Sequence, residues 1–267
     1  MNSWLLLRGL TRDARHWDTF PDHLRAAFPG VPVATADLPG NGARHREASP
    51  ASVAAMVADV RRSVDALDLP RPTGVVALSL GAMVTAAWAT ARPQDLGAAV
   101  LIGTSLRPFS PWVARLRPTA WPDVLRAAWA TAPERADAAE AAVWRLTSRR
   151  PEADRDAVVR QWADWRRAAP VTAANGLRQL WAAARHRAAT TRPGVPLLLL
   201  AGAGDALVHP GCSSRLARAW DVPFHLHPWA GHDVPLDDPD WVVATIRDWT
   251  ATLDTPARTG PVPPKAA

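Results

Sequence analysis

One short stretch, Gly74–Met83, constrains the fold of this chain more than any other. A β-prone valine pair leads into Ser79, and an alanine-rich helical segment follows without a linker. The residues around the serine are small, with Ala77 two positions before it and Gly81 two positions after it. Small residues are needed where a serine sits in a strained strand-to-helix turn, because neighbouring chain crowds against these positions. The stretch therefore predicts a strand, a tight turn that presents the Ser79 hydroxyl, and a helix.

The same order of strand and helix recurs along the first part of the chain and again near its end. Strands that alternate with helices predict a parallel sheet that is covered by helices on both faces. Outside the Ser79 segment, we expect strands over Ser3–Arg8, Val31–Ala36, Ala98–Gly103, Pro196–Leu200 and Val222–His227, and helices over Arg15–Phe28, Ser52–Leu67, Leu80–Ala91 and from Asp238 to about Leu253.

The alternation stops in the middle of the chain, where the apolar spacing is helical throughout. We therefore expect an α/β core over residues 1–107 and 193–254, with about four helices inserted over 108–192. Residues 255–267 are rich in proline and alanine, and we expect a disordered tail there.

Composition limits the partners and the location of the protein. The chain carries a formal charge of +6, but its arginines are spread along the sequence with carboxylates between them. We read this as a solvated surface and expect no nucleic-acid partner. No apolar run approaches the roughly 18 residues that cross a membrane, and the first residues lack a basic leader, so we expect a cytoplasmic protein with no membrane partner. The lone Cys212 excludes an internal disulfide.

Two polar residues follow later predicted strands and complete a candidate site with Ser79. Asp205 comes after the Pro196–Leu200 strand, and His232 follows the Val222–His227 strand. The carboxyl ends of parallel strands meet at one edge of a sheet, so these three side chains are expected close together.

The order serine, aspartate, histidine is that of the α/β-hydrolase superfamily, which the chain resembles. It is similar to small bacterial carboxylesterases with a helical lid, such as the pimeloyl-carrier methyl esterases. Besides the Ser79 segment, the resemblance rests on Leu7–Leu10, Asp37–Gly42, Gly204–Pro210 and Gly231–His232, which together span most of the chain.

The resemblance implies a role for each residue of the site. Ser79 would be the nucleophile, His232 the base that takes its proton, and Asp205 the acid that orients the imidazole. The backbone N–H groups of Leu80 and Leu10 would form the oxyanion hole. The substrate would be a small or medium-chain ester, and neither a cofactor nor a metal is expected.

The chain departs from the family pattern at Arg8, where the family usually has a histidine. Arg8 either makes structural hydrogen bonds to neighbouring loops, the interpretation we favour, or faces the pocket and binds an anionic substrate group.

The same triad also serves lactonases, thioesterases, carbon–carbon bond hydrolases, acyltransferases and cofactor-free peroxidase-like enzymes. A non-catalytic ligand-binding member of the fold is the alternative outside enzymes. Oligomeric state cannot be read from the sequence.

Other interpretations of these residues are weaker. Ser79 could be an ordinary turn serine, but Asp205 and His232 then need separate explanations. His209 competes with His232, yet it follows a strand where the acid is expected. His225 and His227 are spaced like metal ligands, but no suitable ligand follows His232, so we interpret them as strand residues.

Overall fold

The computed structural model describes residues 1–129 and 133–253. The predicted tail at 255–267 lies outside these residues. In the described part, six parallel strands form a sheet in the order β2-β1-β3-β4-β5-β6. The strands are β1 (Ser3–Leu7), β2 (Val33–Ala36), β3 (Thr73–Leu78), β4 (Leu96–Ile102), β5 (Leu197–Gly202) and β6 (Phe224–His227). This arrangement confirms the predicted parallel sheet.

Helices cover both faces of the sheet because its strands are apolar on both sides. On one face lie α1 (Phe20–Ala27) and α11 (Pro239–Leu253), packed against Trp4 and Leu6 of β1. On the other face lie α2 (Val53–Ala66), α3 (Leu80–Ala91) and α9 (Gly211–Trp220), whose buried side chains belong to the same apolar cluster as Leu5 and Leu7. The alternation of side chains along β1 thus divides between two buried layers.

The first predicted helix is wrong in one respect. The Arg15–Phe28 segment is interrupted: a 3-10 turn, η1, covers Ala14–Trp17, and α1 begins only at Phe20. Asp18 between them has a positive φ of 49°. Pro21 explains the break, because proline is accommodated in the first turn of a helix but not in its interior.

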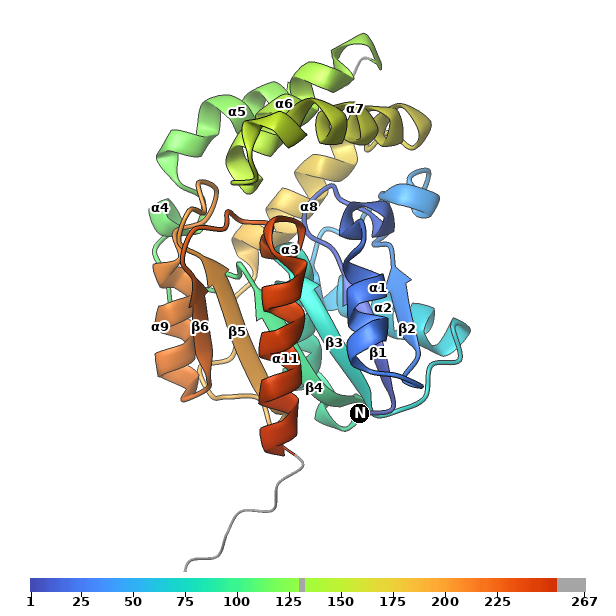
Figure 1. Cartoon of the computed structure of the whole chain (residues 1–267), viewed down its shortest axis with the longest axis vertical. Helices are drawn as coiled ribbons and strands as arrows, with labels where there is room; N and C mark the ends of the chain where they lie inside the picture. Colours follow the sequence, from blue (N-terminus) through green and yellow to red (C-terminus); the bar gives the residue numbers. More distant parts are fainter. Residues whose placement is uncertain (130–132, 254–267) are drawn as a thin grey trace, which may run out of the picture.

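Between β4 and β5 the described chain is helical, as the sequence predicts. The segments are α4 (Trp112–Arg115), α5 (Trp121–Trp129), α6 (Ala136–Thr147), α7 (Glu152–Ala168) and α8 (Ala173–Arg185), of which α4 is a single turn. Figure 1 shows α5, α6 and α7 stacked above the end of the sheet that lies opposite the chain's N-terminus. The insertion therefore covers the edge at which the strands end.

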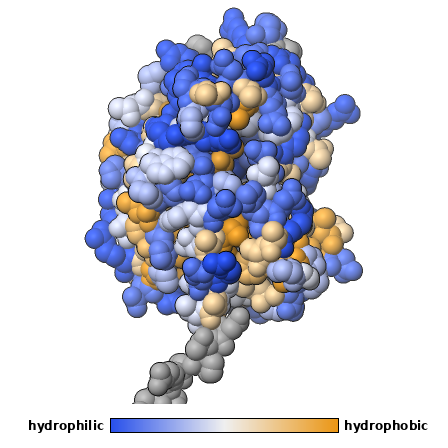
Figure 2. Space-filling view, in the orientation of Figure 1, coloured by the Kyte–Doolittle hydropathy of each residue, from blue (hydrophilic) through white to orange (hydrophobic). Residues whose placement is uncertain are grey.

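The surface of the protein is mostly hydrophilic on the side shown in Figure 2, where hydrophobic areas are scattered among hydrophilic residues. No helix of the described chain is long and apolar enough to cross a membrane.

Strand order reverses between β1 and β3, and ligands of open α/β sheets bind at the carboxyl end of such a reversal.

Candidate active site

Ser79 lies at the carboxyl end of β3, beside that reversal of strand order. It immediately precedes α3 and has φ 57° and ψ −113°, a strained conformation for a residue with a side chain. Its N–H donates to the carbonyl of Ile102 at 2.9 Å, which holds the turn in place. This conformation turns the chain sharply. Ser79 is only partly buried, whereas every residue of the strand before it is buried.

Glycines make this turn sterically feasible, as the small residues around Ser79 predict. A Cβ at Gly9 would lie 2.9 Å from the Cβ of Ser79, and one at Gly81 would lie 2.4 Å from the Leu7 carbonyl oxygen. Both separations are too short for real side chains. The loop after β1 and the first turn of α3 can therefore approach Ser79 only without side chains at these two positions.

Asp205 and His232 come from two different loops and form a buried pair. Asp205 follows β5, and its Oδ2 lies 2.7 Å from Nδ1 of His232. Its other oxygen accepts the backbone N–H groups of Leu207 and Val208, each at 2.8 Å. Because both carboxylate oxygens have partners, Asp205 is fixed in position and orients the imidazole ring.

The surroundings of His232 tune its basicity. Burial alone would lower the pKa of His232, but attraction to Asp205, their hydrogen bond and the charge of Asp233 outweigh it, so the pKa is raised above its ordinary value. Glycine is again needed nearby: a Cβ at Gly103 would lie 3.0 Å from the His232 ring.

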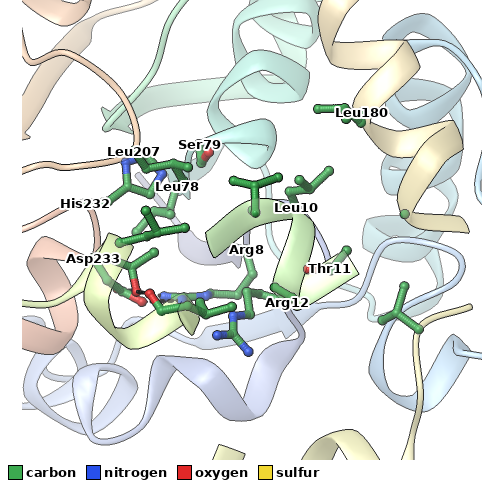
Figure 3. Close-up of a pocket in the computed structure, with 18 of the residues that line it drawn as sticks. Arg8, Leu10, Thr11, Arg12, Leu78, Ser79, Leu180, Leu207, His232 and Asp233 are labelled. Carbon is green, nitrogen blue, oxygen red and sulfur yellow. Dashed lines mark hydrogen bonds and ion pairs between the residues drawn. The ribbon is translucent and has the colours of Figure 1, made fainter. Parts of the chain in front are cut away.

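Ser79 and His232 line the same cavity, which has a volume of about 260 Å³. Figure 3 shows the His232 ring directed toward Ser79. Nε2 of His232 is buried and has no hydrogen-bond partner among the described residues. The structure thus brings together all three residues of the predicted triad, with one ring nitrogen on Asp205 and the other free at the cavity.

The two predicted oxyanion donors lie at the ends of neighbouring strands. Leu80 is the first residue of α3, where N–H groups have no acceptor within the helix. Leu10 lies in the turn after β1 and lines the cavity. Two contacts hold that turn: Arg12 N donates to Gly9 O at 3.3 Å, and Thr11 N donates to Oε1 of Gln179 at 2.8 Å.

Arg8 is buried and binds the residue that follows the predicted histidine base. Its Nη1 donates to Oδ1 of Asp233 at 3.0 Å, and its Nη2 donates to Oδ2 of the same carboxylate. The guanidinium also lies over the Trp17 ring at 4.9 Å. Sequence reasoning did not identify Asp233 as the partner, although its position beside His232 was a signal.

A second charged cluster beside the cavity was also missed. Arg12 Nη1 lies 2.7 Å from Oε2 of Glu140, and Arg166 Nε donates to Oε1 of Glu140 at 2.6 Å. Burial opposes ionisation of Glu140, but the two arginines outweigh it and lower its pKa to about 2. Arg12 and Arg166 both line the cavity. Because Arg12 follows β1, while Glu140 lies on α6 and Arg166 on α7, the ion triad links the loop after β1 to both helices.

The competing histidines have other surroundings. His227 is buried, with Nε2 3.1 Å from Asp238, whereas His225 on the same strand is exposed. Nδ1 of His209 accepts the N–H of Gly211 at 3.0 Å. Within residues 1–129 and 133–253, no group of three metal-ligating side chains is found.

The insertion supplies much of the cavity wall, and this wall is mostly apolar. Its contributions are Val124 and Ala127 from α5, Val143, Leu146 and Thr147 from α6, Arg166 from α7, Val171 and Thr172 before α8, and Ala173, Gly176, Leu177 and Leu180 from α8. A cavity with apolar walls and few polar groups is typical of a small-molecule site.

Comparison with known proteins identifies relatives of this architecture. The family model described as alpha/beta hydrolase fold matches residues 5–239. A thermophilic esterase from Thermogutta terrifontis with malate bound matches with a TM-score of 0.71 and 23% identity, over 96% of this chain and 91% of that one. No curated protein matches the sequence significantly.

Two further solved structures are similar over most of their length. An esterase from Rhodococcus matches with a TM-score of 0.73 and 18% identity, over 94% of this chain and 91% of that one. A Mycobacterium tuberculosis protein named as a non-heme bromoperoxidase matches with a TM-score of 0.71 and 21% identity, over 96% and 94%. At these identities the likeness concerns the fold.

Proposed function

The chain belongs to the alpha/beta hydrolase fold family, and on that premise we propose that it is a serine hydrolase that cleaves a small or medium-chain carboxylic ester. One observation carries the proposal. His232 holds the buried Asp205 with Nδ1 and leaves Nε2 free in the cavity that also contains the strained Ser79. A base oriented in this way beside a serine can activate its hydroxyl.

The proposed reaction proceeds through an acyl-enzyme. Nε2 of His232 takes the hydroxyl proton as Ser79 Oγ attacks the ester carbonyl carbon, and the N–H groups of Leu80 and Leu10 bind the oxygen that becomes negative. His232 then returns the proton to the leaving alcohol, which departs and leaves the acyl group on Ser79. Water, deprotonated by His232, attacks this acyl group. The bond from the acyl carbon to Ser79 Oγ then breaks, His232 returns the proton to Oγ, and the carboxylic acid is released.

Asp205 and Arg8 contribute without touching the substrate in this proposal. Asp205 fixes the tautomer of His232 and stabilises the imidazolium that forms. Arg8 lines the cavity, but both of its Nη atoms are engaged by Asp233, so we assign it a structural role. The insertion over 108–192 acts as a lid whose apolar helix faces receive the acyl group. A cytoplasmic location, expected from the sequence, is part of the same proposal.

Substitution of Ser79 tests the chemistry directly. Members of a triad act as a unit, so Ser79→Ala and His232→Ala should each lower kcat on the order of 10⁶-fold, and Asp205→Asn should lower it less. A matched control is Ser105→Ala, a buried serine that follows the neighbouring strand β4. A fluorophosphonate probe should label the wild type and Ser105→Ala but not Ser79→Ala. Equal turnover in wild type and Ser79→Ala would end the proposal.

A series of chromogenic esters from C2 to C12 tests the substrate class. Each methylene buried in the cavity should raise kcat/KM about three- to fourfold until the chain outgrows the space. A steady decline from C2 would contradict an apolar acyl pocket. Lactone, thioester and acceptor-alcohol substrates, tested in parallel, distinguish the related chemistries of the same triad.

A further inference from the structure

The exposed apolar side chains of this protein are concentrated on one part of the insertion. Of the eleven large apolar side chains exposed in the described part of the chain, seven lie on α4, α5 and α8. Trp112 and Leu177 are each 67% exposed, and Trp181 is 55% exposed. Contiguous exposed apolar surface on a soluble domain usually marks an interaction site.

Positive charge is concentrated in the same two segments. Residues 107–127 and 173–187 together contain seven arginines and one carboxylate, Asp123, a net charge of +6 that equals the total of the whole chain. The rest of the chain thus carries no net charge. We call the exposed side chains of these two segments the entrance face.

These arginines are also largely without counter-charges. Arg126 pairs with Asp123, but none of the other six forms an ion pair with a carboxylate in the described residues. Two of the six, Arg115 and Arg117, are half-buried and donate to backbone carbonyls, so the exposed charge comes from the others. Arg185 instead lies over the ring of Trp181, at 5.0 Å. Elsewhere the buried and half-buried arginines near the site, such as Arg8, Arg12 and Arg15, are paired with carboxylates. The entrance face therefore has a positive potential that, within the described residues, a carboxylate neutralises only at Arg126.

The two segments meet around the cavity. Arg115 of α4 donates to the carbonyl of Ala183 on α8 at 2.7 Å, and α5 and α8 both supply cavity walls. Leu177 and Leu180 belong to both surfaces, because they are exposed and also line the cavity. Figure 3 shows Leu180 across the cavity from Asp233. The apolar interior thus continues outward onto the entrance face between α5 and α8.

We propose that the entrance face docks on an anionic lipid surface, so that an acyl chain can pass from the lipid into the cavity. This proposal replaces the expectation from the sequence that the protein has no membrane partner. Indole rings and leucines beside arginines are the combination with which proteins lie on membrane interfaces, where the cations meet lipid phosphates and the apolar groups enter the acyl boundary. An acidic protein would match the arginines, but a lipid surface also supplies hydrocarbon chains to the apolar cavity that continues onto this face at Leu177 and Leu180. The acyl transfer rests on the proposed function, whereas docking does not.

The test is binding of the full-length protein to lipid vesicles, measured by flotation. Vesicles of phosphatidylcholine with phosphatidylglycerol should bind the protein, pure phosphatidylcholine should bind it much more weakly, and added salt should reduce binding. Each arginine removed from the face should weaken binding about fivefold, so the double variant Arg178→Gln/Arg185→Gln should lose on the order of 25-fold. Trp181→Ser and Leu177→Ser should also weaken it.

Matched variants elsewhere on the surface control for general charge and exposure. Arg160→Gln/Arg218→Gln removes two exposed arginines from α7 and α9, and Leu226→Ser and Trp229→Ser remove apolar groups that are 47% and 45% exposed. These variants should bind only modestly less than the wild type. The proposal would be overturned if the control variants lost as much vesicle binding as the entrance-face variants. It would also be overturned if the wild type did not bind vesicles at low salt.

The other occupants of such a face are distinguishable outcomes. Binding to polyglutamate but not to the vesicles would indicate an acidic protein and overturn lipid docking, as would self-association that Leu177→Ser abolishes. Ser79→Ala should dock like the wild type. Docking without ester hydrolysis would therefore contradict only the proposed function, and hydrolysis of soluble esters without docking would contradict only this inference.

Discussion

In the α/β core, apolar side chains from the strands pack against helices on both faces of the sheet, whereas the insertion meets the core through ion pairs and hydrogen bonds as well as a few apolar contacts. The core clusters contain most of the fully buried side chains, including Leu199 and Val100. The third apolar cluster is small: Trp144, Val159 and Trp162 of the insertion pack with one core residue, Leu236. Some apolar contact is shared, since Ala182 of α8 packs on the core.

Polar contacts between the insertion and the core are numerous by comparison. Thr147 at the end of α6 accepts the N–H of Asp233 at 2.8 Å, and Ser148 Oγ donates to Asp237 at 2.6 Å. Arg15 donates to the carbonyl of Trp165 at 3.0 Å. The two regions should therefore respond to different perturbations: core stability to side-chain volume, and attachment of the insertion to charge and pH.

The largest effect on this attachment is expected from Glu140→Gln. The substitution leaves the guanidinium groups of Arg12 and Arg166 buried without a counter-charge, and breaking a buried ion pair on one side costs about 3–5 kcal/mol. Urea unfolding measures the loss. Leu199→Ala should cost a similar amount, about 2–5 kcal/mol, by leaving a cavity in the core.

Two further variants separate charge from packing at Glu140. Asp248→Asn, which removes one partner of an exposed ion pair with Arg247, should leave stability nearly unchanged. The triple variant Arg12→Met/Glu140→Leu/Arg166→Met removes all three charges and should recover most of the stability that Glu140→Gln loses. A Glu140→Gln protein as stable as the wild type would refute the ionic attachment.

A pH-dependent loss of stability is expected from His16, which lies between the two regions. Burial first, and then repulsion from Arg12, lower its pKa to about 4, although Asp13 opposes the shift. Between pH 6.5 and pH 4 the unfolded chain therefore binds a proton at this position that the folded chain does not. Stability should fall as the pH decreases through this range, by about 3 kcal/mol in all, and be retained above pH 6.5.

Comparison with His16→Gln isolates this contribution from other titrating groups. Glutamine can still accept from Arg12, which approaches Nε2 of His16 at 2.9 Å, but it does not titrate. The difference in unfolding free energy between wild type and variant should change with pH between 6.5 and 4. Parallel stability profiles would show that His16 is not held neutral.

The fold of the core could be predicted from the sequence because the signals are local. Apolar runs of strand length, helical spacing and glycine turns lie within a few residues of one another, and β3, Ser79 and α3 follow directly in the chain. The break before α1 was missed although Pro21 was visible, because the apolar spacing of Trp17, Phe20 and Leu24 suggested one continuous helix.

The candidate site could be predicted in part, and the reason for the limit is distance along the chain. Strand ends bring Ser79, Asp205 and His232 to one edge by topology alone, so their proximity follows from the order of elements. Glu140 and Arg166 instead look like ordinary solvated positions of two helices. Only tertiary packing brings them to Arg12, and no local sequence pattern indicates this contact.

The entrance face was missed for the same reason. Charge averaged over the whole chain suggests an ordinary solvated surface, and the two basic segments are separated by α6 and α7 in the sequence. Counting charge by segment would have revealed the imbalance, but it would not have brought α5 and α8 together at one cavity.

The smallest effect is expected at Gln179, where a single amide joins α8 to two core loops. Its Oε1 accepts from Thr11 N at 2.8 Å, and its Nε2 donates to Asn41 Oδ1 at 2.7 Å and to Ser49 Oγ at 3.0 Å. Gln179→Met keeps the shape but leaves these buried groups without their partner. Stability should fall by about 1–3 kcal/mol, a smaller loss than at Glu140 because the groups are uncharged.

The catalytic constants provide a second measurement for this variant. A purely structural role of Gln179 would change stability and leave kcat unchanged. Thr11 is adjacent to Leu10, whose N–H we propose as an oxyanion donor, so loosening this turn should lower kcat more than it raises KM. Gln161→Met, an exposed glutamine on α7, is the control and should change neither stability nor kcat. If Gln179→Met lost stability but kept its full kcat, the amide would hold α8 to the core without positioning Leu10. The attachment of the insertion would then be independent of the chemistry at Ser79.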